Sequence, residues 1–430
     1  MSHRKNPYLW QSQLAAALVL IAVLAAGCGG PANNGAAPAT DSGTTADPAI
    51  EARRIAASSI IVDTHIDVPF KLLKNPTDVS VSAADFDFDY PRAVAGGLNA
   101  PFMSIYTAAE LDAEGRSREV ADQLIDLVEG MVKAAPDKFA IARSPEDVRS
   151  QFGSGKISLA MGMENGSPIE DDLANVRYFY DRGIRYITLA HSKWNLIADS
   201  SYDEDKHWHG LSDFGVEVVR EMNRVGIMVD VSHISDEAFW DVMDVTAAPV
   251  IASHSSARHF TPGFERNMSD DMIHRLAENG GVIQLNFGSG FLTAKANEYD
   301  KAFWPAAEAF EKAHPDMDQG ELDKAALRAF QAEHGPYPYA DVDDVLAEVD
   351  YVVGLVGIDH VGLGSDFDGV GDTLPVGLKD VSYYPNLIEG LLRRGYDEAD
   401  IRKILGGNLL RVWEAVGTYA AQAASTSSST

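Results

Sequence analysis

The chain has 430 residues, 46% of them hydrophobic, and its 64 acidic residues against 35 basic ones give a formal charge of −29. This excess of negative charge excludes nucleic acid and an anionic membrane surface as partners, because both would repel the protein. The length leaves room for one large domain, and an α/β barrel can take well over 200 residues.

The first 28 residues have the layout of a signal peptide. Basic residues at 3–5 precede an apolar run at 14–24, and small residues then lead to Cys28, the only cysteine. This layout predicts export, and the residues before Cys28 resemble a bacterial lipobox, in which the cysteine becomes lipidated. We therefore expect a lipid anchor in the cell envelope, in the periplasm or at the outer membrane, with simple secretion as the alternative. Residues 29–50 are rich in Gly, Ala, Asn and Thr and predict a flexible linker.

The main domain is expected at 51–418, and its first apolar run, 60–67, ends with His65 and Asp67. Alternate residues of a strand share a face, so both side chains can point to one place above a sheet. A second strand is predicted at 98–106 and carries no chemistry. Read alone, the His-x-Asp pair is a weak motif, and its position at the end of a buried strand is what makes it a candidate metal site.

The next two predicted strands also end in polar residues. The run 157–164 ends in Glu164, an acid that is costly to bury unless it is paired or bound to metal. A helix N-cap or a surface ion pair would also explain this acid. The fourth strand, 186–191, ends in His191.

Two further strands, 227–233 and 249–254, end in His233 and His254 and are separated by a segment long enough for one β-α-β crossover. The carboxyl edge of a parallel sheet is where α/β folds collect their catalytic groups. Either histidine alone could simply satisfy a local backbone group, whereas the pair suggests a shared ligand. Arg266 follows in a long loop, where a barrel keeps substrate-binding groups.

The rest of the chain completes the pattern. A seventh strand is predicted at 281–287, followed by a helical insertion at about 292–340 that could cover the site as a lid. The eighth strand, within 360–369, ends in Asp366 and Asp368, which could also be ordinary turn residues. Closing helices follow, and residues 419–430 are predicted to be a disordered tail.

Eight apolar runs with helical segments between most of them predict a (β/α)8 TIM-like barrel with a metal site at the carboxyl ends of its strands. The candidate ligands are nitrogen and oxygen donors without thiolate, which suits Zn²⁺ and does not exclude Mn²⁺ or Co²⁺. They are too many for one tetrahedral ion. Two ions bridged by a carboxylate and a water would use them all and would supply a hydroxide nucleophile.

The chain resembles the renal (membrane) dipeptidases, zinc peptidases related to the amidohydrolase-like barrels. The likeness extends over about residues 60–416, and its most specific stretches are residues 210–233, 253–258 (Ser-His-Ser-Ser-Ala-Arg) and 362–369 (Gly-Leu-Gly-Ser-Asp-Phe-Asp-Gly). The family implies a dizinc dipeptidase that acts on free dipeptides, with a homodimer as one option for its assembly.

The resemblance also implies a role for each site residue. His65 and Asp67 would hold one zinc, His233 and His254 the other, and Glu164 would bridge them. Of the remaining residues, three would act on the substrate: His191 on the carbonyl oxygen, Arg266 on the free carboxylate, and Asp366 on the proton at the scissile nitrogen.

The sequence departs from the family at two points. It has Asn165 where many relatives have Gly after the glutamate, which puts the shape of the substrate subsite in question, and it lacks the cysteines that animal members use for disulfides. Two alternatives stay open at this stage. One is an amidohydrolase acting on a lactam, cyclic amide or ester, although such enzymes often have His-x-His on strand one and a lysine on strand four. The other is a lipoprotein that binds a ligand without catalysis.

Overall fold

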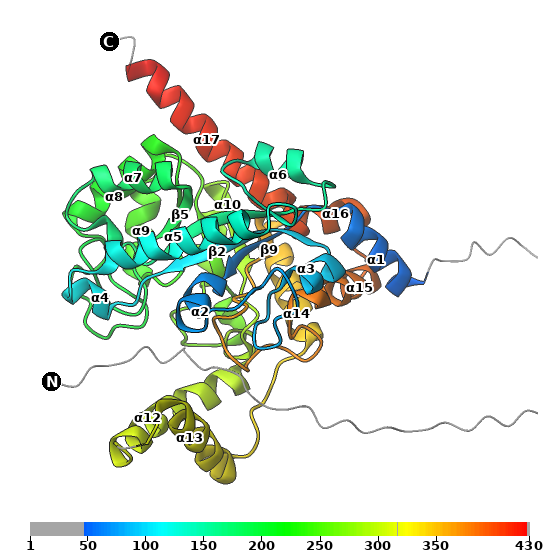
Figure 1. The fold of residues 1–430 in the computed structure, drawn as a ribbon. Coiled ribbons are helices and arrows are strands. Elements are labelled where there is room, and N and C mark those ends of the chain that lie inside the picture. The colour runs from blue at the N-terminus through cyan, green and yellow to red at the C-terminus, as the bar shows by residue number, and fades with distance from the viewer. Residues whose placement is uncertain (1–46, 316, 428–430) are drawn as a thin grey trace, which may run out of the picture.

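A computed structural model describes residues 47–315 and 317–427 of the chain, and its centre is a parallel barrel (Figure 1). Eight strands follow one another around it in the order β1-β2-β4-β5-β6-β7-β8-β9, each parallel to its neighbour. The strands are β1 (Ile61–Ile66), β2 (Leu98–Tyr106), β4 (Ile157–Glu164), β5 (Ile184–Thr188), β6 (Met228–Asp230), β7 (Ile251–Ser255), β8 (Val282–Leu285) and β9 (Val361–Leu363). The predicted barrel and all eight of its predicted strands are confirmed.

The barrel closes between β9 and β1 beyond the end of β9. Ile66 and Phe367 form an isolated parallel bridge, in which the Asp67 amide donates to the Phe367 carbonyl and the Asp366 amide donates to the His65 carbonyl. The last link of the barrel is therefore formed in part by the backbone of candidate site residues His65, Asp67 and Asp366.

Helices surround the barrel and cover its apolar strands (Figure 1). Ser212, Ser235 and Ser269 each cap the helix that follows, because each hydroxyl accepts a hydrogen bond from a first-turn amide. The helices are α1 (Pro48–Ser58), α2 (Val68–Lys74), α3 (Tyr90–Gly96), α4 (Glu110–Ala113), α5 (Ser117–Ala134), α6 (Pro145–Gln151), α7 (Ala174–Arg182), α8 (Asp213–Val225), α9 (Asp236–Val245), α10 (Asp270–Glu278), α11 (Ser289–Leu292), α12 (Ala294–Ala313), α13 (Gln319–His334), α14 (Val342–Val356), α15 (Tyr384–Arg393), α16 (Glu398–Arg402) and α17 (Asn408–Ser427).

The insertion predicted at about 292–340 contains α12 and α13, which pack on each other and project from the barrel below the other helices in Figure 1. Phe303, Leu322 and Phe330 are buried, so the pair has a small apolar core of its own. Whether this pair acts as a lid stays a prediction.

Two parts of the structure differ from the sequence-based expectation. A short strand, β3 (Phe139–Ile141), was not predicted; it pairs with β4 outside the barrel and is too short for its period to be read. The tail predicted as disordered from residue 419 is wrong up to Ser427, because α17 continues to that residue. Tyr419 packs against buried apolar residues at one end of the barrel, and the alanine-rich sequence favours a helix.

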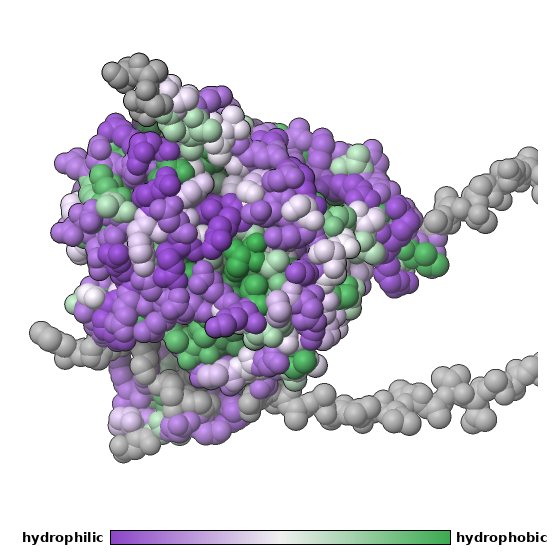
Figure 2. Space-filling model, turned by 45° about the horizontal axis from the view of Figure 1, so that its top comes forward, coloured by the Kyte–Doolittle hydropathy of each residue, from purple (hydrophilic) through white to green (hydrophobic). Residues whose placement is uncertain are grey.

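The predicted signal peptide, Cys28 and most of the predicted linker lie outside the described residues. Within the described part of the chain, no helix combines the length and the apolar character needed to cross a bilayer. The face in Figure 2 is largely hydrophilic with scattered apolar patches, in keeping with the charge of −29.

Candidate metal centre

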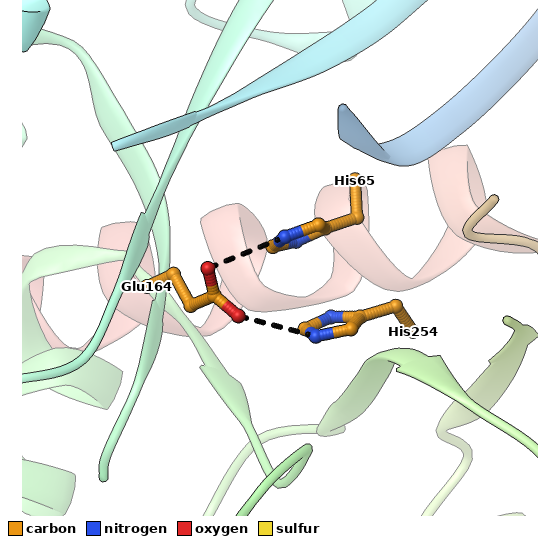
Figure 3. Close-up of side chains that lie close together, drawn as sticks. All are labelled: His65, Glu164 and His254. Atoms are coloured by element: carbon orange, nitrogen blue, oxygen red, sulfur yellow. Dashed lines mark ion pairs between the residues drawn. The ribbon is translucent and has the colours of Figure 1, made fainter. Parts of the chain in front are cut away.

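Glu164, the last residue of β4, lies at the middle of a ring of histidines and is 4% exposed. Its two carboxylate oxygens face different partners: Oε2 faces His65, and Oε1 faces the other three histidines. The distances to histidine Nε2 atoms are 3.4 Å for His65, 3.4 Å for His191, 3.1 Å for His233 and 3.3 Å for His254. Figure 3 shows the His65 and His254 rings side by side, each directed at one oxygen of Glu164.

The orientation of the His65 ring is fixed by a hydrogen bond at Nδ1, the nitrogen that faces away from Glu164. The Tyr186 hydroxyl donates its single proton to the Thr64 carbonyl at 3.0 Å and lies 2.9 Å from His65 Nδ1, so Nδ1 must be the donor in that second contact. Gly162 makes room for this arrangement, since a Cβ there would lie 2.0 Å from the Tyr186 ring. His65 Nε2 is consequently left to face Glu164 and Asp67, and it has no hydrogen-bond partner.

His254 is fixed in the same way by a different pair. The Ser253 hydroxyl donates to Asp230 at 2.6 Å and therefore accepts from His254 Nδ1 at 2.7 Å. Asp230 is fully buried and also accepts the hydroxyl proton of Thr188. With its proton on Nδ1, His254 directs the lone pair of Nε2 toward Glu164.

The ring nitrogens and carboxylate oxygens of the cluster lie close enough together to bind a cation. His233 Nε2 and His254 Nε2 are 2.8 Å apart beside the same carboxylate oxygen, and His65 Nε2 is buried without a hydrogen-bond partner. Ring nitrogens and carboxylates that converge in this way repel one another unless protons or metal ions lie among them. Three groups have ligand atoms within 4.8 Å of one another: His65 with Glu164 and His254; Glu164 with His191 and His233; and His65 with Asp67 and Asp366. The residues therefore fit a metal ion, and Glu164 is shared by two of the groups.

The electrostatics agree with this reading. Burial opposes ionisation of Glu164, but the charges of His65 and His191 and hydrogen bonds from His191 and His233 outweigh it, so its pKa lies well below the usual value. Burial, followed by the positive charge of Arg266, places the pKa of His233 well below its ordinary value. The site thus holds an ionised carboxylate and a neutral imidazole, which are the forms that bind metal.

His65 behaves differently from its neighbours. Burial works against a charge on this ring, but electrostatic interactions with Tyr186, Glu164 and Asp67 outweigh burial and raise its pKa well above the ordinary value. This end of the site therefore attracts a positive charge, and a metal ion at Nε2 would displace the proton held there.

Asp366 follows β9 in a left-handed backbone conformation, with φ of 64°. Its Oδ2 accepts a hydrogen bond from the Asn286 amide at 2.8 Å, which orients the carboxylate. Burial is the main reason that the pKa of Asp366 rises to about 7; His65 opposes the rise, and Asp67 and Glu164 add to it.

A cavity opens over this cluster, and its wall combines acids and histidines with aromatic and aliphatic side chains. His191 and His233 reach the cavity, and His191 Nδ1 has no hydrogen-bond partner. Among the residues of α12 and α13 whose side chains the structure describes, none is part of this wall, although Phe291 of the neighbouring α11 is. The lining residues are Asp67, Phe70, Tyr106, Glu164, His191, Tyr202, His233, Phe291, Asp366, Asp368, Gly369 and Val370.

Arg266 lies beside the cluster, behind the wall of the cavity, and is 3% exposed. Its terminal nitrogens donate to the Ser255 hydroxyl and the His254 carbonyl, each at 2.7 Å, and its Nε has no partner. The guanidinium carbon is 5.4 Å from the centre of the Phe291 ring, and Phe291 lines the cavity.

The structure brings together all of the predicted metal-ligating residues, with His191 and Asp366 beside them and Arg266 at the edge. Sequence reasoning missed the residues that orient them, Tyr186, Asp230 and Ser253. Two of these were within reach, because Asp230 and Ser253 are polar residues inside apolar runs, and such residues need partners. Positive φ at His233 and Asp366 carries no signal in the sequence.

Comparison with known proteins agrees with this geometry. The model of a family described as "Membrane dipeptidase (Peptidase family M19)" matches residues 50–427. Dipeptidase tcpJ of Claviceps purpurea is 35% identical over 340 residues, which cover 77% of this chain and 70% of that protein.

Two solved structures of bacterial proteins share the fold. The probable dipeptidase PvdM of Pseudomonas aeruginosa superimposes with a TM-score of 0.76 at 28% identity, covering 87% of this chain and 99% of the other. A metallopeptidase of Rhodobacter sphaeroides, liganded with a phosphinate mimic of the dipeptide L-Ala-D-Ala, superimposes with a TM-score of 0.68 at 27% identity, covering 83% and 99%.

Proposed function

The chain belongs to the membrane dipeptidase family, peptidase family M19, and from that premise we propose that it hydrolyses free dipeptides with the aid of two zinc ions. One observation carries the proposal. The two oxygens of Glu164 face separate histidine groups, as a carboxylate that bridges two metal ions must do. The phosphinate dipeptide mimic bound to the Rhodobacter sphaeroides relative supports a dipeptide as substrate.

The ligands divide into two sets. As the family resemblance implies, His65 and Asp67 would hold one ion, His233 and His254 would hold the other, and Glu164 would belong to both. The directions of the two Glu164 oxygens support this division, since Oε2 faces His65 and Oε1 faces His233 and His254. Nitrogen and oxygen donors without thiolate suit zinc. A pair of ions held in this way lowers the pKa of a bound water toward neutrality and so supplies the nucleophile for hydrolysis.

The chain's own side chains supply the remaining functions. His191 reaches the cavity and has an unpartnered Nδ1, so the ring can reorient to donate to the carbonyl oxygen of the scissile bond as that oxygen gains charge. Asp366, oriented by Asn286, can accept a proton from the attacking water and pass it to the leaving amine.

Arg266 is assigned to the free carboxylate of the substrate. Its terminal nitrogens each donate one hydrogen bond, to Ser255 and His254, so Nε and one further hydrogen on each terminal nitrogen remain available as donors. Phe291 lines the cavity and packs 5.4 Å from the guanidinium carbon, so a shift of this side chain would open a path from the cavity to Arg266.

Purified protein loaded with Zn²⁺ should cleave dipeptides, and it should lose this activity on the same dipeptides with an amidated carboxyl terminus. Arg266→Ala should lose activity on free dipeptides, whereas Arg220→Ala, an exposed arginine on α8, should not. Preference for amidated substrates, lactams or esters would instead identify an amidohydrolase of another specificity.

Metal content tests the bridge itself. Glu164→Ala should lose the paired ions, measured as metal per chain, and retention of two tightly held ions would contradict the bridging role. Export and a lipid on Cys28 remain part of the proposal, and mass spectrometry of the mature N-terminus in the cell envelope tests both.

A further inference from the structure

The turn after β9 holds two non-glycine residues in the left-handed region, Asp366 with φ of 64° and Asp368 with φ of 65°. Aspartate tolerates this conformation better than most residues, yet two such residues so close together persist only where the surroundings hold them. Asp366 is the residue to which the proposed function assigns proton transfer. Its position therefore depends on whatever holds the turn.

Asp368 is fixed on every side. Its Oδ1 accepts hydrogen bonds from Lys71 Nζ at 2.7 Å and from the Asp87 amide at 2.8 Å, and its Oδ2 accepts one from the Phe88 amide at 3.2 Å. Its own amide donates to the Asp87 carboxylate at 2.8 Å. The Asp368 side chain is fully buried, and both of its oxygens accept hydrogen bonds from the protein, so its contacts hold the turn although its residue lines the cavity. We call Asp368, Lys71 and Asp87 the Asp368 brace.

The brace reaches the candidate metal ligands through Lys71. Lys71 is the fourth residue of α2, where its amide donates to the Asp67 carbonyl at 3.2 Å, and Asp67 is the residue directly before this helix. The ion pair of Lys71 with Asp368 therefore ties the start of α2 to the turn that carries Asp366.

Gly369 shows how closely the start of α2, at Asp67, approaches the turn that carries Asp366. A Cβ at this position would lie 2.2 Å from an oxygen of Asp366 and 2.2 Å from an oxygen of Asp67. The two carboxylates therefore lie against the same backbone atom, and a small shift of the turn relative to α2 changes how they lie toward each other.

We propose that Asp368 and Lys71 are positioning residues. They hold the carboxylate of Asp366, the proposed proton-transfer residue, in a fixed position relative to that of Asp67, the proposed metal ligand. The proposal rests on the function proposed above. The buried ion pair would still act as a positional link where its net contribution to stability is small, because burying both charges offsets their attraction.

The test compares Lys71→Met, which removes the charge and keeps the length of the stem, with Lys71→Arg, which restores the charge. The matched control is Arg182→Met, which breaks the partly buried pair between α7 and Asp122 of α5, away from the site. For each variant, kcat and KM on a dipeptide, metal per chain and thermal unfolding are measured.

We expect Lys71→Met to lower kcat by about 10²-fold, the loss typical of a misplacement of about 1 Å. KM should change little, two ions per chain should remain, and Lys71→Arg should recover most of the rate. A loss of thermal stability equal to that of Arg182→Met, with kcat unchanged, would overturn the proposal. If Lys71→Met does not fold, Lys71→Gln retains a neutral donor and takes its place in the same comparison.

A crystal structure of Lys71→Met separates this inference from the proposed function. The brace predicts that residues 366–370 move relative to Asp67, whether or not the wild type cleaves dipeptides. An unmoved turn refutes the brace, whereas a wild type that is inactive on dipeptides with both ions bound refutes the function alone.

Discussion

Replacing Ser253 with alanine should weaken metal binding, although Ser253 is not itself a candidate ligand. In the wild type, the Ser253 hydroxyl accepts a hydrogen bond from His254 Nδ1 at 2.7 Å and donates one to Asp230 at 2.6 Å. Ser253→Ala leaves a ring that is 1% exposed without an acceptor for that proton. The other tautomer, with its proton on Nε2 facing Glu164, then becomes competitive, and a proton at that nitrogen blocks a metal ion.

The size of the effect follows from the contact that is lost. Leaving a buried donor unsatisfied costs about 1–3 kcal/mol, which corresponds to roughly 5- to 150-fold weaker binding. Loss of an orienting residue behind a metal-bound histidine typically weakens affinity by about this amount. The hydroxyl is small, so the cavity left by the substitution adds little to the effect.

The assay is a titration of metal-free protein with Zn²⁺ in competition with a chromophoric chelator. Ser158→Ala is the matched control, because Ser158 is also a buried strand serine, with its hydroxyl bonded to Gln151 at 2.7 Å outside the metal site. If Ser253→Ala binds zinc as tightly as Ser158→Ala does, the reasoning from the tautomer is refuted.

Three further predictions concern Asp300 of α12, Glu348 of α14 and Gly369 beside the site. Burial raises the pKa of Asp300 to about 7, so the stability that it gives α12 is present below the pKa of the unfolded chain and is lost as pH rises from there to about 7. The protection factors of the α12 amides, which correct exchange rates for their intrinsic rise with pH, should fall over that interval, and Asp300→Asn should abolish this dependence. Burial also raises the pKa of Glu348 well above its ordinary value, and its Oε1 lacks a partner. Its contribution to stability therefore falls as pH rises above the pKa of the unfolded chain, and Glu348→Gln should raise the melting temperature at alkaline pH more than at acidic pH. Gly369→Ala should lower metal content and activity together, since its methyl group meets both carboxylates beside it; equal metal content in the variant would contradict the close approach.

The barrel could be predicted because its strands are short apolar runs with polar ends. A residue such as Glu164 or His254 at the end of a buried strand is costly unless it has a partner, and parallel strands bring their carboxyl ends to one rim. Physical chemistry alone therefore indicated a polar site at that rim. The pairing of particular ligands with particular ions came from the family resemblance, and it remains a proposal.

What the sequence could not indicate depends on contacts between distant segments. The tautomer of His65 depends on Tyr186, which lies 121 positions away and reaches the ring only because Gly162 leaves space. The turn at Asp366 depends on Lys71, almost 300 residues earlier in the chain. No local periodicity carries either relation, because each exists only once the barrel has closed.

The closure of the barrel also explains why the site is placed where it is. β9 ends at Leu363, yet the backbone still pairs with β1 at Phe367, so the chain crosses the rim between the two strands with Asp366 on it. The same few residues then close the barrel, orient a carboxylate toward the cluster and accept the Lys71 ion pair. A change in this segment should therefore alter catalysis before it alters the fold, since the other seven junctions between neighbouring strands keep their own hydrogen bonds.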